Sequence, residues 1–205
     1  MRVYAESNFV LEIVLGQEGY AACAEFVVSA ERGELELVLP AFSLFEPFTT
    51  LDRRRGERGE LQRQIQDELR QIGRTQAFAQ EAAANTLPAL LVRSTQEAAD
   101  RFIEARESLL RIARLLPLTT DVLRAAVAAE VTYELSFPDA IVLASVLADL
   151  AAAPSRACFL NRNTKDFDEP DVRAALTAQD CHVIGSFDHG LQYVRAQLRT
   201  AVPPV

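Results

Sequence analysis

Four carboxylates that are far apart in the chain fall at the ends of predicted elements or in helices with apolar neighbours, where an unpaired acid is costly. Hard divalent cations prefer oxygen ligands, and Mg²⁺ takes one or a few carboxylates while it keeps several waters. A metal-dependent phosphodiester nuclease needs acids that are distant in sequence but converge in space, because the bound ions generate hydroxide and neutralise charge. The four candidates are Glu6, Glu46, Asp139 and Asp166.

Each of these acids also has a purely structural interpretation. Glu6 can be a solvated acid at the end of a strand, and Glu46 can be an exposed acid on a helix. Asp139, as the third residue of a helix, suits the helix dipole and can reach back to the amide of the capping residue. Asp166 can cap the turn before the next helix. Spacing alone therefore does not identify a site.

The composition leaves little material for other chemistry. The cysteines Cys23, Cys158 and Cys181 are scattered in apolar segments without a Cys-x-x-Cys pair, so we expect reduced core residues. The only histidines, His182 and His189, leave little material for a zinc site or a Ser–His triad. With 29 acids and 21 bases the net charge is −8, which excludes a globally basic nucleic-acid binder but allows local basic patches.

Length and hydropathy predict one cytoplasmic domain. At 205 residues the chain is long enough for one α/β domain, residues 1–205, and short for two. No apolar run reaches the roughly 18 residues that span a bilayer. The first residues lack the small-residue cleavage site of a signal peptide. We therefore expect no membrane partner.

The elements that must position the acids alternate between strand and helix. Short apolar or alternating runs predict strands at residues 2–5, 34–40, 156–160 and 181–185. Strands that alternate with helices predict an α/β fold with a mostly parallel sheet covered on both faces. Sites in such sheets form beyond the carboxyl ends of the strands, and both Glu6 and the segment that contains Asp166 lie at such ends.

Hydroxyl residues mark the predicted helix starts. Ser7 lies at the junction between the first strand and a helix, and Thr120 is placed to cap another. Ser136 caps the next helix, with Pro138 in its first turn and Asp139 as its third residue.

Residues 56–116 look helical throughout, in two arms separated by residues 85–88 with no strand between them. One face of the first arm is apolar, and arginines lie on the opposite face. The second arm opens with a capping box at residues 94–97 and continues with an apolar stripe. The pattern predicts a helical hairpin inserted at about residues 52–116.

Four segments, in this order, resemble the PIN family. Residues 4–11 (YAESNFVL) resemble its opening strand and turn, usually Asp followed by Thr or Ser and Asn. Residues 39–46 (LPAFSLFE) are similar to a strand, a proline and a helix that bears a metal-site Glu. Residues 135–144 (LSFPDAIVLA) resemble the helix start whose Asp binds metal. Residues 159–167 (FLNRNTKDF) resemble Thr-Arg-Asn or Thr-Arg-Asp, two residues, and then Asp-Phe.

This resemblance covers residues 1–51 and 117–190. It implies a three-layer α/β/α fold and an endoribonuclease dependent on Mg²⁺ or Mn²⁺, often a toxin held by an antitoxin protein and usually a homodimer. The metal-binding and catalytic residues that it implies are Glu6, Glu46, Asp139 and Asp166. The supporting residues are Asn8, Asn161 and Asn163.

Two departures from the family pattern favour a different class of function. Glu6 stands where the family prefers Asp, and its extra methylene moves the carboxylate and loosens a tight octahedral site. Asn161 stands where Thr or Ser is expected. The alternative is a catalytically weakened PIN-like scaffold that acts through its helical arms as an RNA- or protein-binding module. A carboxylate-based phosphatase on another fold would need an Asp nucleophile motif at the first strand, which is missing here.

An RNA substrate also needs cations away from the metal. Arg162 and Lys165 lie beside the expected metal site, and Arg53, Arg54 and Arg55 begin the hairpin. The alternative for the hairpin arginines is that neighbouring acids pair with them on a solvated helix. The arms can instead bind a second subunit or a protein partner.

Overall fold

The computed structural model describes residues 1–162 and 167–201, so Asn163, Lys165 and Asp166 lie outside the described residues. The chain divides into two compact units. The first comprises Met1–Pro47 and Ala105–Val205, and the second comprises Phe48–Glu104. Within the described residues no single helix is long and apolar enough to cross a membrane, and the helices Thr120–Tyr133 and Phe137–Ala152 pass that test only as a pair bent by 114°.

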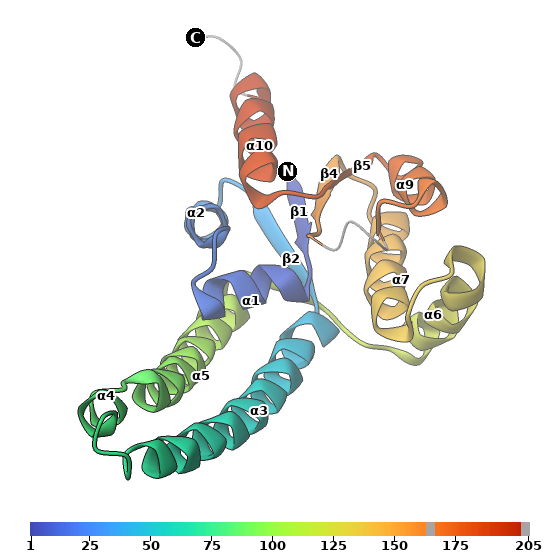
Figure 1. Cartoon of the computed structure of the whole chain (residues 1–205). Helices are drawn as coiled ribbons and strands as arrows, with labels where there is room; N and C mark the ends of the chain where they lie inside the picture. The colour runs from blue at the N-terminus through green and yellow to red at the C-terminus, as the bar shows by residue number, and fades with distance from the viewer. Residues whose placement is uncertain (163–166, 202–205) are drawn as a thin grey trace. The chain divides into compact units, whose positions relative to one another are not determined.

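The first unit is built on a five-stranded sheet in which every strand pair is parallel, as the alternation of strands and helices predicts. The strand order is β3-β2-β1-β4-β5, with β1 in the middle (Figure 1). The chain adds β2 and β3 on one side of β1 and then crosses to add β4 and β5 on the other. The strands are β1 Arg2–Ala5, β2 Glu36–Pro40, β3 Arg114–Leu116, β4 Ala157–Leu160 and β5 Cys181–Ile184.

Helices lie on both faces of this sheet, which is compatible with a three-layer α/β/α fold. Figure 1 shows α1, α2 and α10 on one face and α6, α7 and α9 on the other. The helices of this unit are α1 Ser7–Leu15, α2 Tyr20–Glu31, α6 Thr120–Tyr133, α7 Phe137–Ala152, α9 Pro170–Thr177 and α10 Phe187–Ala201.

Apolar side chains of the central strands fill the space between sheet and helices. Tyr4 and Phe159 are fully buried in the cluster that includes α6, α7 and α9. On the other face Phe9 packs edge-on against Phe26 and Phe187, with ring centroids 6.2 and 5.8 Å apart. Burial of such a side chain contributes roughly 2–3 kcal/mol. These layers hold the carboxyl ends of β1 and β4 in place.

Polar residues form a network near the start of β1, at the opposite end of the strands from Glu6. Arg114 donates to both oxygens of Asp149 at 2.8 and 2.7 Å and to Glu36 at 2.5 Å. Tyr4 donates its hydroxyl to Asp149 at 2.6 Å. Arg2 donates to Glu36 at 3.0 Å and to the Tyr4 hydroxyl at 3.1 Å. The network joins three strands to the end of α7.

This network accounts for a strand that the sequence analysis assigned to the second helical arm. Residues 114–116 form β3 rather than helix, because they pair with β2 in the register Val38↔Arg114. The ion pairs of Arg114 hold the segment extended. Three residues are too few to show an alternating pattern, so tertiary contacts decide the conformation.

Two of the three predicted helix caps are displaced by one residue. Glu6, not Ser7, is the N-cap of α1, and its side chain accepts from the backbone N–H of Asn8. Thr119, not Thr120, caps α6. Ser136 caps α7 as predicted, with Asp139 as the third helical residue.

The second unit consists of helices, as predicted, and its two long helices lie side by side (Figure 1). These helices are α3 Phe42–Ile72, whose first turns belong to the first unit, and α5 Leu87–Ile112, whose last turns do; α4 Ala79–Ala83 lies between them in sequence. The prediction that a capping box at residues 94–97 starts the second arm is wrong. Helix α5 begins earlier, at Leu87, and the hydroxyls of Ser94 and Thr95 donate to the Leu91 carbonyl within it. The side chain of Asn85 instead accepts from Leu87 N–H at 3.0 Å.

Candidate carboxylate site

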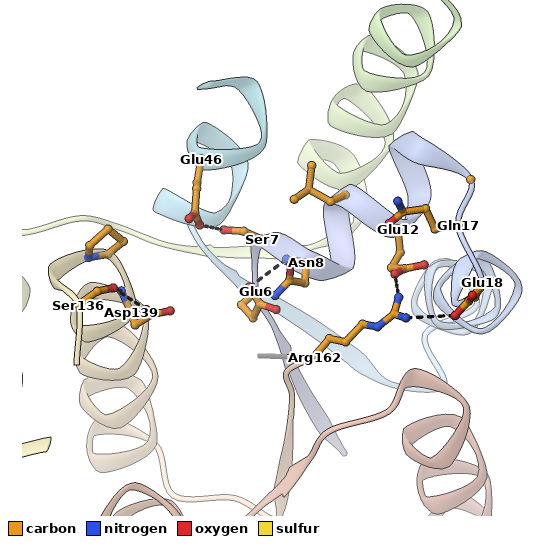
Figure 2. Close-up of a pocket in the computed structure, with 13 residues that line it drawn as sticks. Glu6, Ser7, Asn8, Glu12, Gln17, Glu18, Glu46, Ser136, Asp139 and Arg162 are labelled. Carbon is orange, nitrogen blue, oxygen red and sulfur yellow. Dashed lines mark hydrogen bonds and ion pairs between the residues drawn. The ribbon is translucent and has the colours of Figure 1, made fainter. Parts of the chain in front are cut away.

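The carboxyl ends of β1 and β4 open into a pocket of about 1070 Å³. It lies where the chain reverses its direction across the sheet, which is where open parallel sheets place their sites. Three of the four predicted acids, from three different elements, line this pocket (Figure 2). They are Glu6, Glu46 and Asp139.

Glu6 is the most deeply buried of the three. It follows β1 directly, its residue is 6% exposed, and Oε2 accepts from Asn8 N–H at 2.9 Å. Among the described residues Oε1 is buried and has no hydrogen-bond partner. The pKa of Glu6 is raised from 4.5 to about 7, mainly because of burial; the hydrogen bonds from Asn8 lower it, and the charges of Glu46 and Asp139 raise it. An ionised carboxylate is costly to bury unless it is paired or binds a metal ion, so Oε1 is an oxygen that a bound cation would stabilise.

Glu46 reaches the pocket from the first turns of α3, which begins just after Pro40 ends β2. Ser7 donates its hydroxyl to Glu46 Oε2 across the pocket (Figure 2). Ser7 is 3% exposed and Glu46 is partly exposed, so this contact is partly shielded from water. The hydroxyl that was expected to cap α1 orients a site carboxylate instead.

Asp139 lies in the first turn of α7, where the Ser136 hydroxyl donates to Oδ2 at 2.5 Å. Its own backbone N–H points to the Ser136 hydroxyl at 3.4 Å. Asp139 therefore has the capping geometry of the structural interpretation and also lines the pocket. The capping role and a metal-binding role of Asp139 are compatible. The Ser136 hydroxyl uses only one lone pair of the carboxylate, so the other lone pairs of Asp139 remain for a ligand.

The carboxylates do not form a complete coordination shell. In residues 1–162 and 167–201, no group of three or more His, Cys, Asp or Glu side chains is arranged to hold a metal ion. The donors are nevertheless all oxygens, which suits Mg²⁺ or Mn²⁺. The unpartnered Oε1 of Glu6 is the feature that fits a cation best.

The supporting asparagines divide between the pocket and the sheet. Asn8 lines the pocket and holds Glu6 through its backbone N–H. Asn161 is 2% exposed, and its backbone N–H donates to the Ile184 carbonyl at 3.1 Å. Asn163 lies outside the described residues, as Asp166 and Lys165 do.

The same pocket also contains an ion-pair cluster that was not predicted from the sequence. Arg162 contacts Glu12 through Nη1 and Glu18 at 3.2 Å through Nη2 (Figure 2). Glu12 is 2% exposed, and its Oε2 accepts from Gly19 N–H at 2.8 Å. Its place in the apolar run of α1 was the available signal, since a buried acid needs a partner.

The arginines expected to bind RNA in the hairpin lie on α3. Arg53 pairs with Glu57 at 2.7 Å and Arg70 pairs with Asp67 at 2.8 Å, as the solvated-helix interpretation expects. Both pairs are exposed and contribute little to stability. Arg55 is exposed and Arg54 is partly buried on the same helix.

The three cysteines are free and buried, as predicted. Burial raises the pKa values of Cys23 and Cys158 strongly and that of Cys181 to about 12. The thiols therefore stay protonated at neutral pH, which is the state of inert core cysteines.

Comparison with known proteins identifies no relative of this chain: no family model, curated protein or solved structure matches it. The pocket and the four sequence segments are therefore the features that bear on its function.

Proposed function

We propose that this protein is a PIN-like endoribonuclease that depends on Mg²⁺ or Mn²⁺. The observation that carries the proposal is the convergence of Glu6, Glu46 and Asp139 on one pocket at the carboxyl ends of the central strands. The buried Oε1 of Glu6 supports it, because that oxygen has no hydrogen-bond partner among the described residues. The resemblance of four ordered segments to the PIN family supplies the reaction class.

The residues that would hold the ion are Glu6, Glu46 and Asp139, with Asp166 as the fourth acid from the segment after β4. When bound, Mg²⁺ or Mn²⁺ supplies an activated water and neutralises charge at the scissile phosphate. Ser7 and Ser136 orient Glu46 and Asp139 by donating hydroxyl hydrogens. Such outer partners fix the direction of ligand oxygens and tune metal affinity.

Cleavage of a mixed RNA pool in Mn²⁺ tests the proposal. We expect the wild type to cut and Asp139→Asn to lose activity on the order of 100-fold or more, because one anionic ligand is removed. Asp121→Asn is the matched control, since Asp121 also lies in the first turn of a helix but pairs with Arg124 at 3.0 Å away from the pocket. Absence of cleavage by the wild type while circular dichroism shows it folded contradicts the nuclease proposal.

A second candidate function is a catalytically weakened scaffold that binds RNA or protein. The incomplete coordination shell among the described residues favours it. So do exposed apolar side chains of the hairpin, which are half exposed at Phe78 and Val92. Gain of RNA cleavage in Glu6→Asp would show that Glu6 lowers the activity of a nuclease site. RNA binding without cleavage in both proteins would support the scaffold.

The partners follow from the same resemblance. We propose RNA as the substrate, a second copy of the chain as a subunit, and an antitoxin protein as the regulator. The apolar residues exposed on the hairpin favour a protein partner there, because two helices cannot bury them alone.

A further inference from the structure

Glu12 is buried in the pocket but is not one of the proposed metal ligands. It makes two contacts from α1: Oε2 accepts from Gly19 N–H at 2.8 Å, and Oε1 pairs with Arg162. An ionised carboxylate inside a protein is costly unless it is paired and hydrogen-bonded. Here both oxygens have such a partner, so Glu12 is a fixed anionic anchor.

The turn between α1 and α2 is shaped around this anchor. A Cβ atom at Gly19 would lie 2.8 Å from Cδ2 of Phe187 and 3.1 Å from Oε2 of Glu12. Only glycine allows the backbone to approach this closely. The close approach brings the Gly19 N–H within reach of the carboxylate, which fixes the direction of its second oxygen toward Arg162.

The two partners of Arg162 differ sharply in exposure. The side chain of Glu12 is 3% exposed and that of Glu18 is 91% exposed, while Arg162 itself is 45% exposed. Water and salt screen the contact with Glu18, so that contact is weak. A guanidinium carries five N–H donors in a planar fork. A phosphate can therefore replace Glu18 while Arg162 keeps its contact with Glu12.

We propose that Glu12 is a positioning residue that holds Arg162 for an RNA phosphate, and that Glu18 is the partner which the phosphate displaces. The inference rests on the proposed nuclease function and assigns the phosphate-binding cation of that site. Arg162 directly follows Asn161 at the end of β4 and lines the same pocket as Glu6. It is thus placed to bind the backbone beside the bond that is cut.

The substitution Glu12→Gln distinguishes a positioning role from a merely structural ion pair, because the two roles predict opposite changes in RNA affinity. If Glu12 only neutralises Arg162, Glu12→Gln removes a negative charge near RNA and tightens binding. If Glu12 positions Arg162, the same change weakens binding although the protein becomes more positive. Glutamine keeps an amide oxygen that can accept from Gly19 N–H, so this variant preserves the turn.

The experiment measures binding of a labelled single-stranded RNA by fluorescence anisotropy in EDTA, where no cleavage occurs. We expect Glu12→Gln and Arg162→Met each to weaken binding roughly 10-fold, the size of one lost charge-assisted contact. The double variant should be no weaker than Arg162→Met. Glu18→Gln should tighten binding. Glu25→Gln is the control, because Glu25 forms a similar exposed pair with Arg195 at 2.8 Å.

The salt dependence of RNA binding provides a second measurement, which a purely structural role of Glu12 would leave unchanged. Loss of one phosphate contact should reduce the slope of log K against log salt by about 0.7 for single-stranded RNA. We expect this reduction in Arg162→Met and in Glu12→Gln, but not in Glu25→Gln. Tighter or unchanged binding by Glu12→Gln, with the wild type binding and cutting RNA, overturns the positioning role alone. No RNA binding by the folded wild type in EDTA overturns this inference, and absence of cleavage in Mn²⁺ as well overturns the nuclease proposal.

Discussion

Glu6 combines burial with charge at a single residue. Because its folded pKa is about 7 against an ordinary value of 4.5, the folded state binds the proton more tightly than the unfolded chain does. The resulting stabilisation is fully present below pH 4.5 and is lost as the pH rises through about 7. The ionised side chain therefore destabilises the metal-free protein at alkaline pH.

The raised pKa of Glu6 in the folded state predicts how the stability of the protein depends on pH. In EDTA, the free energy of unfolding of the wild type should fall between pH 5 and pH 8, relative to Glu6→Gln, by roughly 2.5 kcal/mol. Glu6→Gln remains neutral throughout and should lack this component. Urea unfolding at the two pH values, with Glu25→Gln as an exposed control, measures the difference. Parallel pH profiles for the wild type and Glu6→Gln would contradict the raised pKa.

Arg114 acts at the scale of elements, because it ties β3 to the sheet and to α7. The hydrogen bonds from Arg114 are the main reason that the pKa of Asp149 lies below its ordinary value. A carboxyl with a lowered folded pKa stabilises the protein above its unfolded pKa, and this contribution is lost on acidification. The network is therefore a source of stability at neutral pH.

Removal of this guanidinium should weaken the edge of the sheet. Asp149 is 14% exposed and Arg114 is 36% exposed, so solvent screens part of their attraction. We expect Arg114→Met to lower the free energy of unfolding by roughly 2 kcal/mol, since it leaves Asp149 with fewer partners. Arg124→Met, at an exposed pair, should cost under about 0.5 kcal/mol. Equal effects of the two changes in urea unfolding would show that the network contributes no more than a surface pair.

Elements with a strong local pattern were predictable from the sequence, and elements held by distant contacts were not. The apolar runs at residues 2–5 and 156–160 correspond to β1 and β4, and their parallel pairing follows from the intervening helices. By contrast, β3 depends on pairing with Val38 and on ion pairs to Asp149 and Glu36.

The same distinction holds within the site. Glu6 and Asp139 were identified by motif position, and both line the pocket. Glu12 was missed because its partner Arg162 lies 150 residues away in the sequence. No local period records such a contact, so only the folded chain reveals it.

At the scale of the whole molecule, the hairpin leaves large apolar side chains exposed. Val92 and Ile103 are 51% and 48% exposed, and both point outward on α5 relative to the buried Ala98 and Phe102. We propose that this exposed face of α5 binds another protein. A second copy of the chain is the partner that the proposed function implies.

We expect the purified protein to be a dimer and Val92→Glu/Ile103→Glu to be a monomer, because buried charge opposes association. Size-exclusion chromatography with light scattering measures the mass of each. Val131→Glu is the control, since Val131 is 83% exposed on α6. A monomeric wild type would exclude a homodimer at that concentration, and dissociation by the control would place the interface elsewhere.

The order of strands in the sheet also has a consequence during synthesis. β1 is made first, but its neighbour β4 comes from Ala157–Leu160, and the pocket takes Asp139 and Arg162 from the same late part of the chain. A ribosome that has translated the hairpin has therefore produced only part of the pocket. Nascent chains and fragments truncated before residue 139 should be inert. For a protein proposed to cut RNA, this delays activity until the ribosome that makes it has almost finished.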